Sequence, residues 1–149
     1  QAPTGKSPAF MMQALRDPDG ANLDRIQIVK GWLDASGETQ ERVYDVAWSD
    51  SDSRKVGSDG KVPSVGTTVD EKEATYTNTI GAPSLTGYWQ DPEFDPKLKA
   101  FYYVRVLEIP SPRWLAYDRK NYNLYDVMPK DLLYSSQERA YASPIWYQP

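Results

Sequence analysis

Twelve prolines are spread along this chain of 149 residues and interrupt it at short intervals. A proline removes a hydrogen bond from the interior of a helix, so frequent prolines limit how long a helix can be. Aromatic residues make up 13% of the sequence, with eleven Tyr and five Trp against three Phe. Aromatic side chains are enriched in strands. Together these features favour short strands joined by turns over long helices.

Alternating apolar residues predict a series of strands separated by turn residues. The strands are expected at residues 8–15, 23–33, 43–48, 74–80, 101–109 and 139–147. The Asp-Pro-Asp-Gly sequence that ends at Gly20 predicts a turn, which would join the first two strands as a hairpin and make the first three a meander. Apolar residues of both parities indicate that the second strand is central. The fifth strand has the strongest pattern and is also expected to be central, while Pro144 marks a bulge or an edge position in the last strand.

The remaining segments predict loops and turns. Residues 49–68 lack apolar periodicity, so we expect an exposed or partly disordered loop whose shortening at 50–66 costs little stability. Short helical turns are expected at 95–100 and 129–133. The predicted fold class is mainly all-β, an antiparallel β-sandwich of about six to seven strands with one or two short helical turns and a long polar loop. One domain at residues 8–149 would follow a lead-in segment at 1–7.

The composition excludes several chemistries. The chain contains no histidine and no cysteine, which excludes disulfides, thiolate metal sites, cysteine nucleophiles and histidine general bases. The formal net charge is −4, and the Lys and Arg residues are scattered, which argues against nucleic acid or an anionic membrane as a partner. No apolar run approaches the ~20 residues of a membrane-spanning helix. The first residue, Gln1, suggests a fragment of a longer protein.

Five stretches of the sequence agree in order and spacing with one protein family. They are residues 23–32 (LDRIQIVKGW), 42–49 (RVYDVAWS), 74–82 (ATYTNTIGA), 101–114 and 137–147 (QERAYASPIWY). These stretches closely resemble the C-terminal end of the bacterial proteins grouped as domain-of-unknown-function family 3604. The resemblance covers most of the chain.

That resemblance implies a longer parent protein, whose upstream part is similar to a metallohydrolase of the polymerase-and-histidinol-phosphatase (PHP) type with His, Asp and Glu ligands around divalent metals. It implies that this chain is the C-terminal module, with no catalytic, cofactor-binding or metal-ligating residues and no cofactor of its own. The upstream catalytic domain would be its partner. Phosphoesterase activity of the parent and a periplasmic or secreted location are implied in the same way.

Two polar patterns in the long loop invite a catalytic or metal-binding interpretation. Four aspartates in or beside the loop offer oxygen ligands for calcium; they are Asp50, Asp52, Asp59 and Asp70. Their spacing does not fit an EF-hand, so a solvated acidic loop is favoured. Ser58 and Lys61 have the S-x-x-K spacing, but a glycine-containing loop does not bring them onto one helix face.

Carboxylates suited to a glycosidase pair are also present; they are Glu93, Asp95, Glu108 and Glu138. Such a pair needs an acid and a base roughly 5 to 10 Å apart. Nothing in the sequence brings two of them together, so ion pairs and exposed strand positions are favoured.

The tryptophans suggest a non-catalytic surface. Three of them occur in strand patterns beside aliphatic residues and are predicted to be core; they are Trp32, Trp48 and Trp146. The other two, Trp89 and Trp114, lie in predicted turns, where a ring is freer to be exposed. With their neighbours they are the candidate ligand or domain interface: Tyr88, Trp89, Arg113 and Trp114.

Two functions therefore compete. The first is a non-catalytic C-terminal module that supports or completes the catalytic domain of a PHP-like metal-dependent hydrolase. The second is a carbohydrate- or ligand-binding β-sandwich that uses exposed aromatic rings. A self-contained hydrolase built on carboxylates ranks behind both. The sequence specifies neither a substrate nor an oligomeric state.

Overall fold

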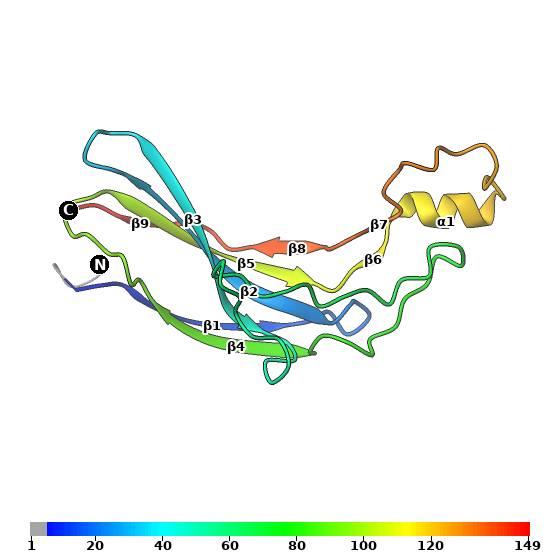
Figure 1. Ribbon diagram of the computed structural model, residues 1–149, viewed down its shortest axis with the longest axis horizontal. Coiled ribbons are helices and arrows are strands. Elements are labelled where there is room, and N and C mark those ends of the chain that lie inside the picture. The colour runs from blue at the N-terminus through cyan, green and yellow to red at the C-terminus, as the bar shows by residue number, and fades with distance from the viewer. Residues whose placement is uncertain (1–5) are drawn as a thin grey trace.

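The computed structural model describes residues 6–149, which form two facing β layers and a projecting helical lobe (Figure 1). The larger layer is an antiparallel sheet of five strands, β3 (Thr39–Trp48), β2 (Leu23–Leu33), β5 (Ala100–Glu108), β8 (Arg139–Tyr141) and β9 (Ile145–Tyr147). The smaller layer pairs β1 (Ala9–Leu15) with β4 (Ser84–Gln90). A short ladder of β6 (Ser111–Pro112) and β7 (Ser135–Ser136) leads into the lobe, which carries α1 (Trp114–Asn121).

The predicted mainly β, antiparallel sandwich is confirmed. The nine strands within residues 6–149 exceed the six or seven expected, because β6 and β7 are additional strands of two residues each and because the last expected strand is split into β8 and β9 around Pro144. Both halves pair with β5 and share one edge of the larger sheet. Of the expected lead-in segment 1–7, residues 1–5 lie outside the described residues.

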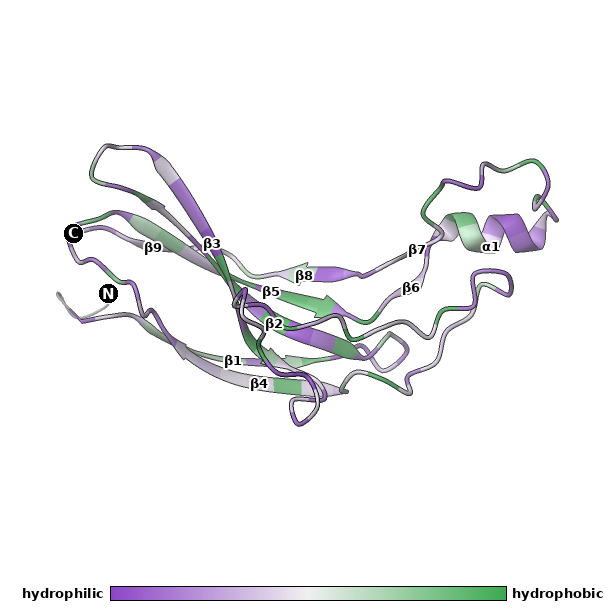
Figure 2. Cartoon of the chain, viewed as in Figure 1, coloured by the Kyte–Doolittle hydropathy of each residue, from purple (hydrophilic) through white to green (hydrophobic). Residues whose placement is uncertain are grey.

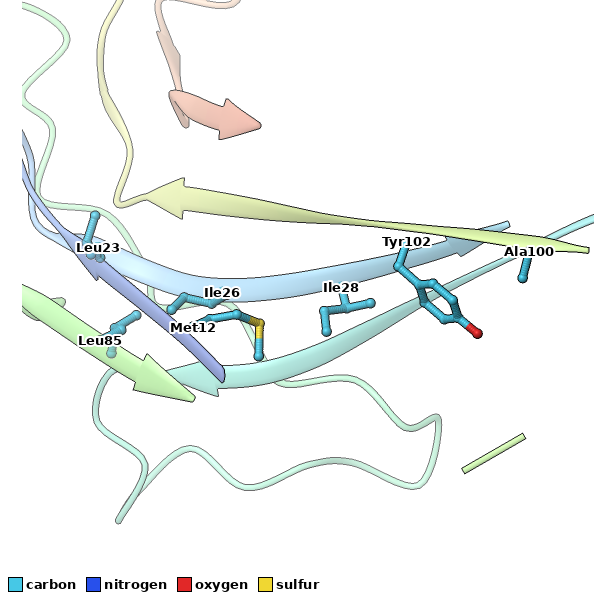
Figure 3. Close-up of a cluster of buried hydrophobic side chains, with 7 residues drawn as sticks. All are labelled: Met12, Leu23, Ile26, Ile28, Leu85, Ala100 and Tyr102. Carbon is cyan, nitrogen blue, oxygen red and sulfur yellow. The ribbon is translucent and has the colours of Figure 1, made fainter. Parts of the chain in front are cut away.

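The main core lies between the two layers. Alternate residues of β2 and β5 face β1 and β4, because successive side chains of a strand point to opposite faces. The buried members of this cluster are Met12, Leu23, Ile26, Ile28, Leu85, Ala100 and Tyr102 (Figure 3). Both β2 and β5 have a neighbour on each side, so their predicted central positions are confirmed.

The predicted hairpin between the first two strands, and with it the meander, is wrong. The turn does form, with the Gly20 N–H donating to the Asp17 carbonyl at 2.9 Å. It passes the chain from one layer to the other, so β1 pairs with β4 while β2 pairs with β3 and β5. The Asn22 side chain holds the crossing point by donating to the carbonyls of Asn78 and Ile80.

The strand predicted at 74–80 is also absent, and β4 forms downstream of it instead. Ala74 has a φ of 49°, which turns the chain where a strand would need to stay extended. The sequence pattern does not predict a strand at 84–90, because Gly87 is a residue typical of turns. In the fold, a Cβ at Gly87 would lie 3.1 Å from Ala47 and from Val46, so the glycine permits the close approach of β3 to β4.

The only helix within residues 6–149 is α1, and neither of the two predicted helical turns forms one. α1 buries a single residue, Ala116. Its last turn is instead tied to a distant loop, where Arg119 and Lys120 donate to the carbonyls of Glu71 and Glu73. Because tertiary contacts rather than a buried apolar face hold this helix, the sequence has no apolar periodicity that would predict it.

The long polar connection at 49–68 packs against the sheet rather than lying free. Arg54 donates to the Asp24 carboxylate at 2.6 Å, and both side chains are buried. The Val62 N–H donates to Asp45 at 2.9 Å, and Arg25 pairs with Asp45 at 3.0 Å. We call Asp24, Arg25, Asp45 and Arg54 the ion network. Most residues of the loop are exposed, as expected, but Arg54 and Val62 are buried, because they supply hydrogen-bond partners for Asp24 on β2 and Asp45 on β3.

No helix within residues 6–149 has the length and apolar character needed to cross a membrane.

Arg54→Ala is expected to lower the melting temperature by about 10 °C, because removing one partner of a buried ion pair costs about 3–5 kcal/mol. Thermal unfolding followed by circular dichroism measures the change. The matched control is Lys55→Ala, whose side chain is exposed in the same loop and should change stability by less than ~0.5 kcal/mol. Equal melting temperatures for the two variants would contradict a stabilising role of the network.

Candidate functional site

An open row of aromatic rings lies on the face of the larger sheet that points away from the core. The rings of Phe101 and Tyr103 on β5 are nearly parallel, with centroids 6.3 Å apart. Trp146 of β9 adds a ring 5.2 Å from Phe101, and Tyr141 of β8 adds one 6.2 Å from Tyr103. We call these four residues the aromatic row. The row arises because alternate side chains of β5 point to this face of the sheet. Side chains of β8 and β9, which pair in register with β5, continue it on the same face.

A groove of about 530 Å³ runs beside the aromatic row, across the ends of β2, β3, β5 and β9. Its floor contains Gly31, where a Cβ would lie 2.4 Å from the Phe101 ring, so the missing side chain makes room for that ring. Leu33 and Trp146 add apolar walls, and Trp146 is 67% exposed. The polar rim consists of Thr39, Gln40, Glu41, Lys99 and Gln148. The groove thus combines exposed aromatic surface with hydrogen-bonding side chains.

A buried Lys30–Asp91–Tyr102 cluster has the residue types of an acid–base site. Lys30 lies 2.6 Å from the Asp91 carboxylate, and the Tyr102 hydroxyl donates to the same oxygen at 2.7 Å. Burial and the hydrogen bond to Asp91 raise the pKa of Tyr102. The adjoining cavity of about 20 Å³ has room for little more than one water. The cluster therefore neutralises buried charge and offers no space for a substrate.

Two of the sequence-predicted interface residues fall on opposite faces of β4. Trp89 lies in this strand rather than in a turn, and it is half-buried between Phe10 and Tyr44, with ring centroids 6.0 and 4.9 Å away. The expectation that Trp89 is free is therefore wrong, because β4 aims it at the core. Tyr88 points the other way, is exposed and pairs in register with the exposed Met11.

The other two predicted residues, Arg113 and Trp114, lie at the start of α1, far from β4 along the chain. They line a polar cleft of about 650 Å³ together with Glu138 and Arg139. Trp114 is 65% exposed, so its predicted exposure is confirmed although it lies in a helix rather than in a turn. The four predicted interface residues thus do not form one surface: Tyr88 is exposed on β4, Trp89 faces the core, and Arg113 and Trp114 line the cleft at the start of α1.

Trp146 was predicted to be core, and this is wrong. The signal for its exposure was present, because Pro144 already indicated an edge strand, where one face of a ring lacks a neighbour. Trp32 and Trp48 are half-buried. Sequence reasoning also missed Phe101 and Tyr141 as surface aromatics, because the covering of a sheet face depends on elements distant in sequence.

Two of the four aspartates considered as calcium ligands accept hydrogen bonds from nearby backbone N–H groups. Asp59 accepts the Lys61 N–H at 3.1 Å, and Asp70 accepts the N–H groups of Lys72 and Glu73 at 3.0 Å. Among the described residues, no group of three His, Cys, Asp or Glu side chains is arranged to hold a metal ion. Residues 57–60 form a turn, in which the Gly60 N–H donates to the Gly57 carbonyl, so the S-x-x-K spacing does not place Ser58 and Lys61 on one helix face.

Two of the four carboxylates considered for a glycosidase pair are engaged elsewhere. Glu93 pairs with Arg42 and accepts the Tyr44 hydroxyl at 2.8 Å, and Asp95 accepts the Lys97 N–H. Glu108 and Glu138 are the pair that the fold brings near each other, since the Glu108 N–H donates to the Glu138 carbonyl at 3.1 Å. Burial raises the pKa of the Glu108 carboxyl, and the charge of Glu138 raises it further.

Comparison with known proteins gives one family. The family model described as "Protein of unknown function (DUF3604)" matches residues 1–149. No curated protein and no solved structure matches the chain.

Glu108→Gln is expected to stabilise the protein at neutral pH and to have little effect near pH 4. Because the folded pKa is raised above the ordinary value of about 4.5, the folded state holds this proton more tightly than the unfolded chain does. Ionisation of Glu108 therefore destabilises the fold as pH rises through that window. Glutamine keeps an acceptor for the Ala21 N–H, which Glu108 accepts in the native protein.

The measurement is the difference in melting temperature between Glu108→Gln and the wild type from pH 4 to pH 8, which should grow with pH. Glu138→Gln serves as the control and should produce a smaller shift of the same sign, because it removes only the neighbouring charge. A difference that stays constant with pH would contradict the raised pKa.

Proposed function

The chain belongs to the DUF3604 family of proteins of unknown function, and we propose that it is a non-catalytic module that supports a metal-dependent hydrolase domain of the same parent protein. The resemblance described above implies the nature of that partner, a PHP-like catalytic domain upstream with phosphoesterase activity. In this proposal the present chain is the C-terminal module, and it supports the catalytic domain by docking onto it.

The chemistry of the chain supports a non-catalytic role. It has no histidine and no cysteine, the side chains that most often hold a catalytic zinc together with carboxylates. Its buried Asp24 and Asp91 carboxylates are occupied by Arg54, Arg25 and Lys30. Carboxylates that are paired with buried cations in this way stabilise the fold and are not free to act as catalytic groups.

The observation that carries the docking role is the apolar surface of the lobe, residues 110–136. The lobe projects from the end of the sandwich opposite the C-terminus (Figure 1). Its large exposed apolar side chains are Trp114, Tyr117, Tyr122, Val127, Leu132 and Leu133. Figure 2 shows hydrophobic colour at the start of α1 and along the loop that follows. Such a concentration on one lobe is typical of an interaction surface.

The lobe is held in place despite its small core. That core contains Ala74, Ala116 and Tyr134. The Arg119 guanidinium lies 3.7 Å from the centre of the Tyr134 ring, a cation–π contact, and Tyr125 donates to the Lys72 carbonyl at 2.8 Å. A surface fixed by such contacts is preorganised, which lowers the entropic cost of docking.

The pure chain is expected to show only background hydrolysis of phosphomonoesters, phosphodiesters and glycosides in the presence of Mg²⁺, Mn²⁺ or Zn²⁺. The assay is product release from chromogenic substrates before and after repurification. A metal-dependent rate that survives repurification and disappears in Glu108→Gln or Glu138→Gln would overturn the non-catalytic role.

In the parent protein, Trp114→Ala combined with Leu133→Ser should remove apolar contacts between the lobe and the catalytic domain. The weaker docking should lower the melting temperature of the catalytic domain. The same pair should leave the melting temperature of the isolated chain within about 2 °C, because both side chains are exposed there. Differential scanning calorimetry of both proteins measures this. Met11→Ser with Tyr88→Ala is the matched control on the exposed face of β1 and β4. Equal effects of the two double variants on the parent would contradict docking through the lobe.

A further inference from the structure

The groove beside the aromatic row lies at the other end of the molecule from the lobe, and the docking role leaves it unused. It crosses β2 and β5, whose backbone groups pair with each other and with β3 and β9. A peptide strand therefore finds no free backbone edge on the groove floor, so β-strand addition is excluded there. A ligand in this groove contacts side chains.

Aromatic stacking is the main interaction that the groove offers. Trp146 is two-thirds exposed and rests against Phe101 at 5.2 Å, which holds the indole while leaving much of its surface open. Tyr103 stacks on Phe101 in turn, and Gly31 gives Phe101 its space. The platform is thus built from packed side chains on adjacent strands, which lowers the entropy lost on binding.

The polar rim selects among ligands that stack. It offers one acid and one base, Glu41 and Lys99, and the amide of Gln148, whereas the Gln40 amide already donates to Asp34 at 2.9 Å. One charge of each sign favours neither an anion nor a cation, and the net charge of −4 further disfavours anions. Donors and acceptors around an apolar platform match a neutral molecule that has hydroxyl groups at its edges and C–H groups on its faces.

We propose that this groove binds a short neutral saccharide, with one pyranose ring stacked on Trp146 and its hydroxyls bonded to Glu41, Lys99 and Gln148. The volume of about 530 Å³ lies within the range of about 300–1,000 Å³ that small-molecule sites occupy. The open shape suits a ligand that enters from the side, such as an internal segment of an oligosaccharide.

The test is a titration of the ¹⁵N-labelled chain with neutral tri- and tetrasaccharides of glucose, xylose, mannose and N-acetylglucosamine, followed by NMR. Binding should shift the indole N–H signal of Trp146 and the backbone amides of Phe101 and Lys99. The indole signal of Trp114 should stay unchanged, because the lobe lies at the opposite end of the sandwich.

Trp146→Ala should weaken the binding by roughly tenfold or more, because the stacked ring is lost. The matched control is Trp114→Ala, since the two tryptophans are equally exposed at 67% and 65%. Glu41→Ala, on the far wall of the groove, should weaken binding while leaving β9 untouched, so the test does not depend on the folding of one variant.

Three results would overturn the proposal. The first is the absence of Trp146 shifts with every saccharide, and the second is binding that survives Trp146→Ala. The third is protection of Trp146 from acrylamide quenching in the parent protein, which would make the groove a domain contact. None of these results bears on docking through the lobe, so the two proposals fail separately.

Discussion

Strand β2 is the element on which the rest of the fold depends, because every residue from Leu23 to Gly31 is buried. Burial on both faces requires two covers. The pair β1 and β4 covers one face with apolar side chains. The connection at 49–68 covers part of the other, where Arg25 donates to the carbonyls of Val62 and Pro63 at 2.8 Å. The central strand therefore determines where the β1–β4 pair and the long loop must lie.

The buried polar residues of β2 give this arrangement its specificity. Burying a charge is costly unless it is paired, so each one demands a particular partner. Arg54 and Gln137 both reach Asp24, from segments 30 and 113 residues away. Lys30 reaches Asp91 at the opposite end of the strand. A loop displaced from its place would leave a buried charge without a partner, whereas apolar contacts alone would tolerate small shifts.

The two surfaces left uncovered differ in chemistry. The lobe presents several exposed aliphatic and aromatic side chains, Trp114 among them, a composition that fits another protein surface. The groove presents the rings of Phe101 and Trp146, tilted at 49° to each other, beside a polar rim. They lie at opposite ends of an elongated molecule (Figure 1). One domain therefore has room for a docking contact and a ligand site that do not compete for the same residues.

The sequence by itself determined the β class, the absence of histidine and cysteine chemistry, and the central strands, because these depend on residue type and on local alternation. It also identified Trp114 as exposed. Tertiary structure decided that β1 pairs with β4, that Trp89 is packed into the core and that Trp146 is open. The partner of a strand and the residues that cover a sheet face come from segments far apart in the chain. Local sequence patterns do not specify which of these segments come into contact. The same reason explains why a loop that looks solvated holds Arg54, the partner of a charge buried on the central strand.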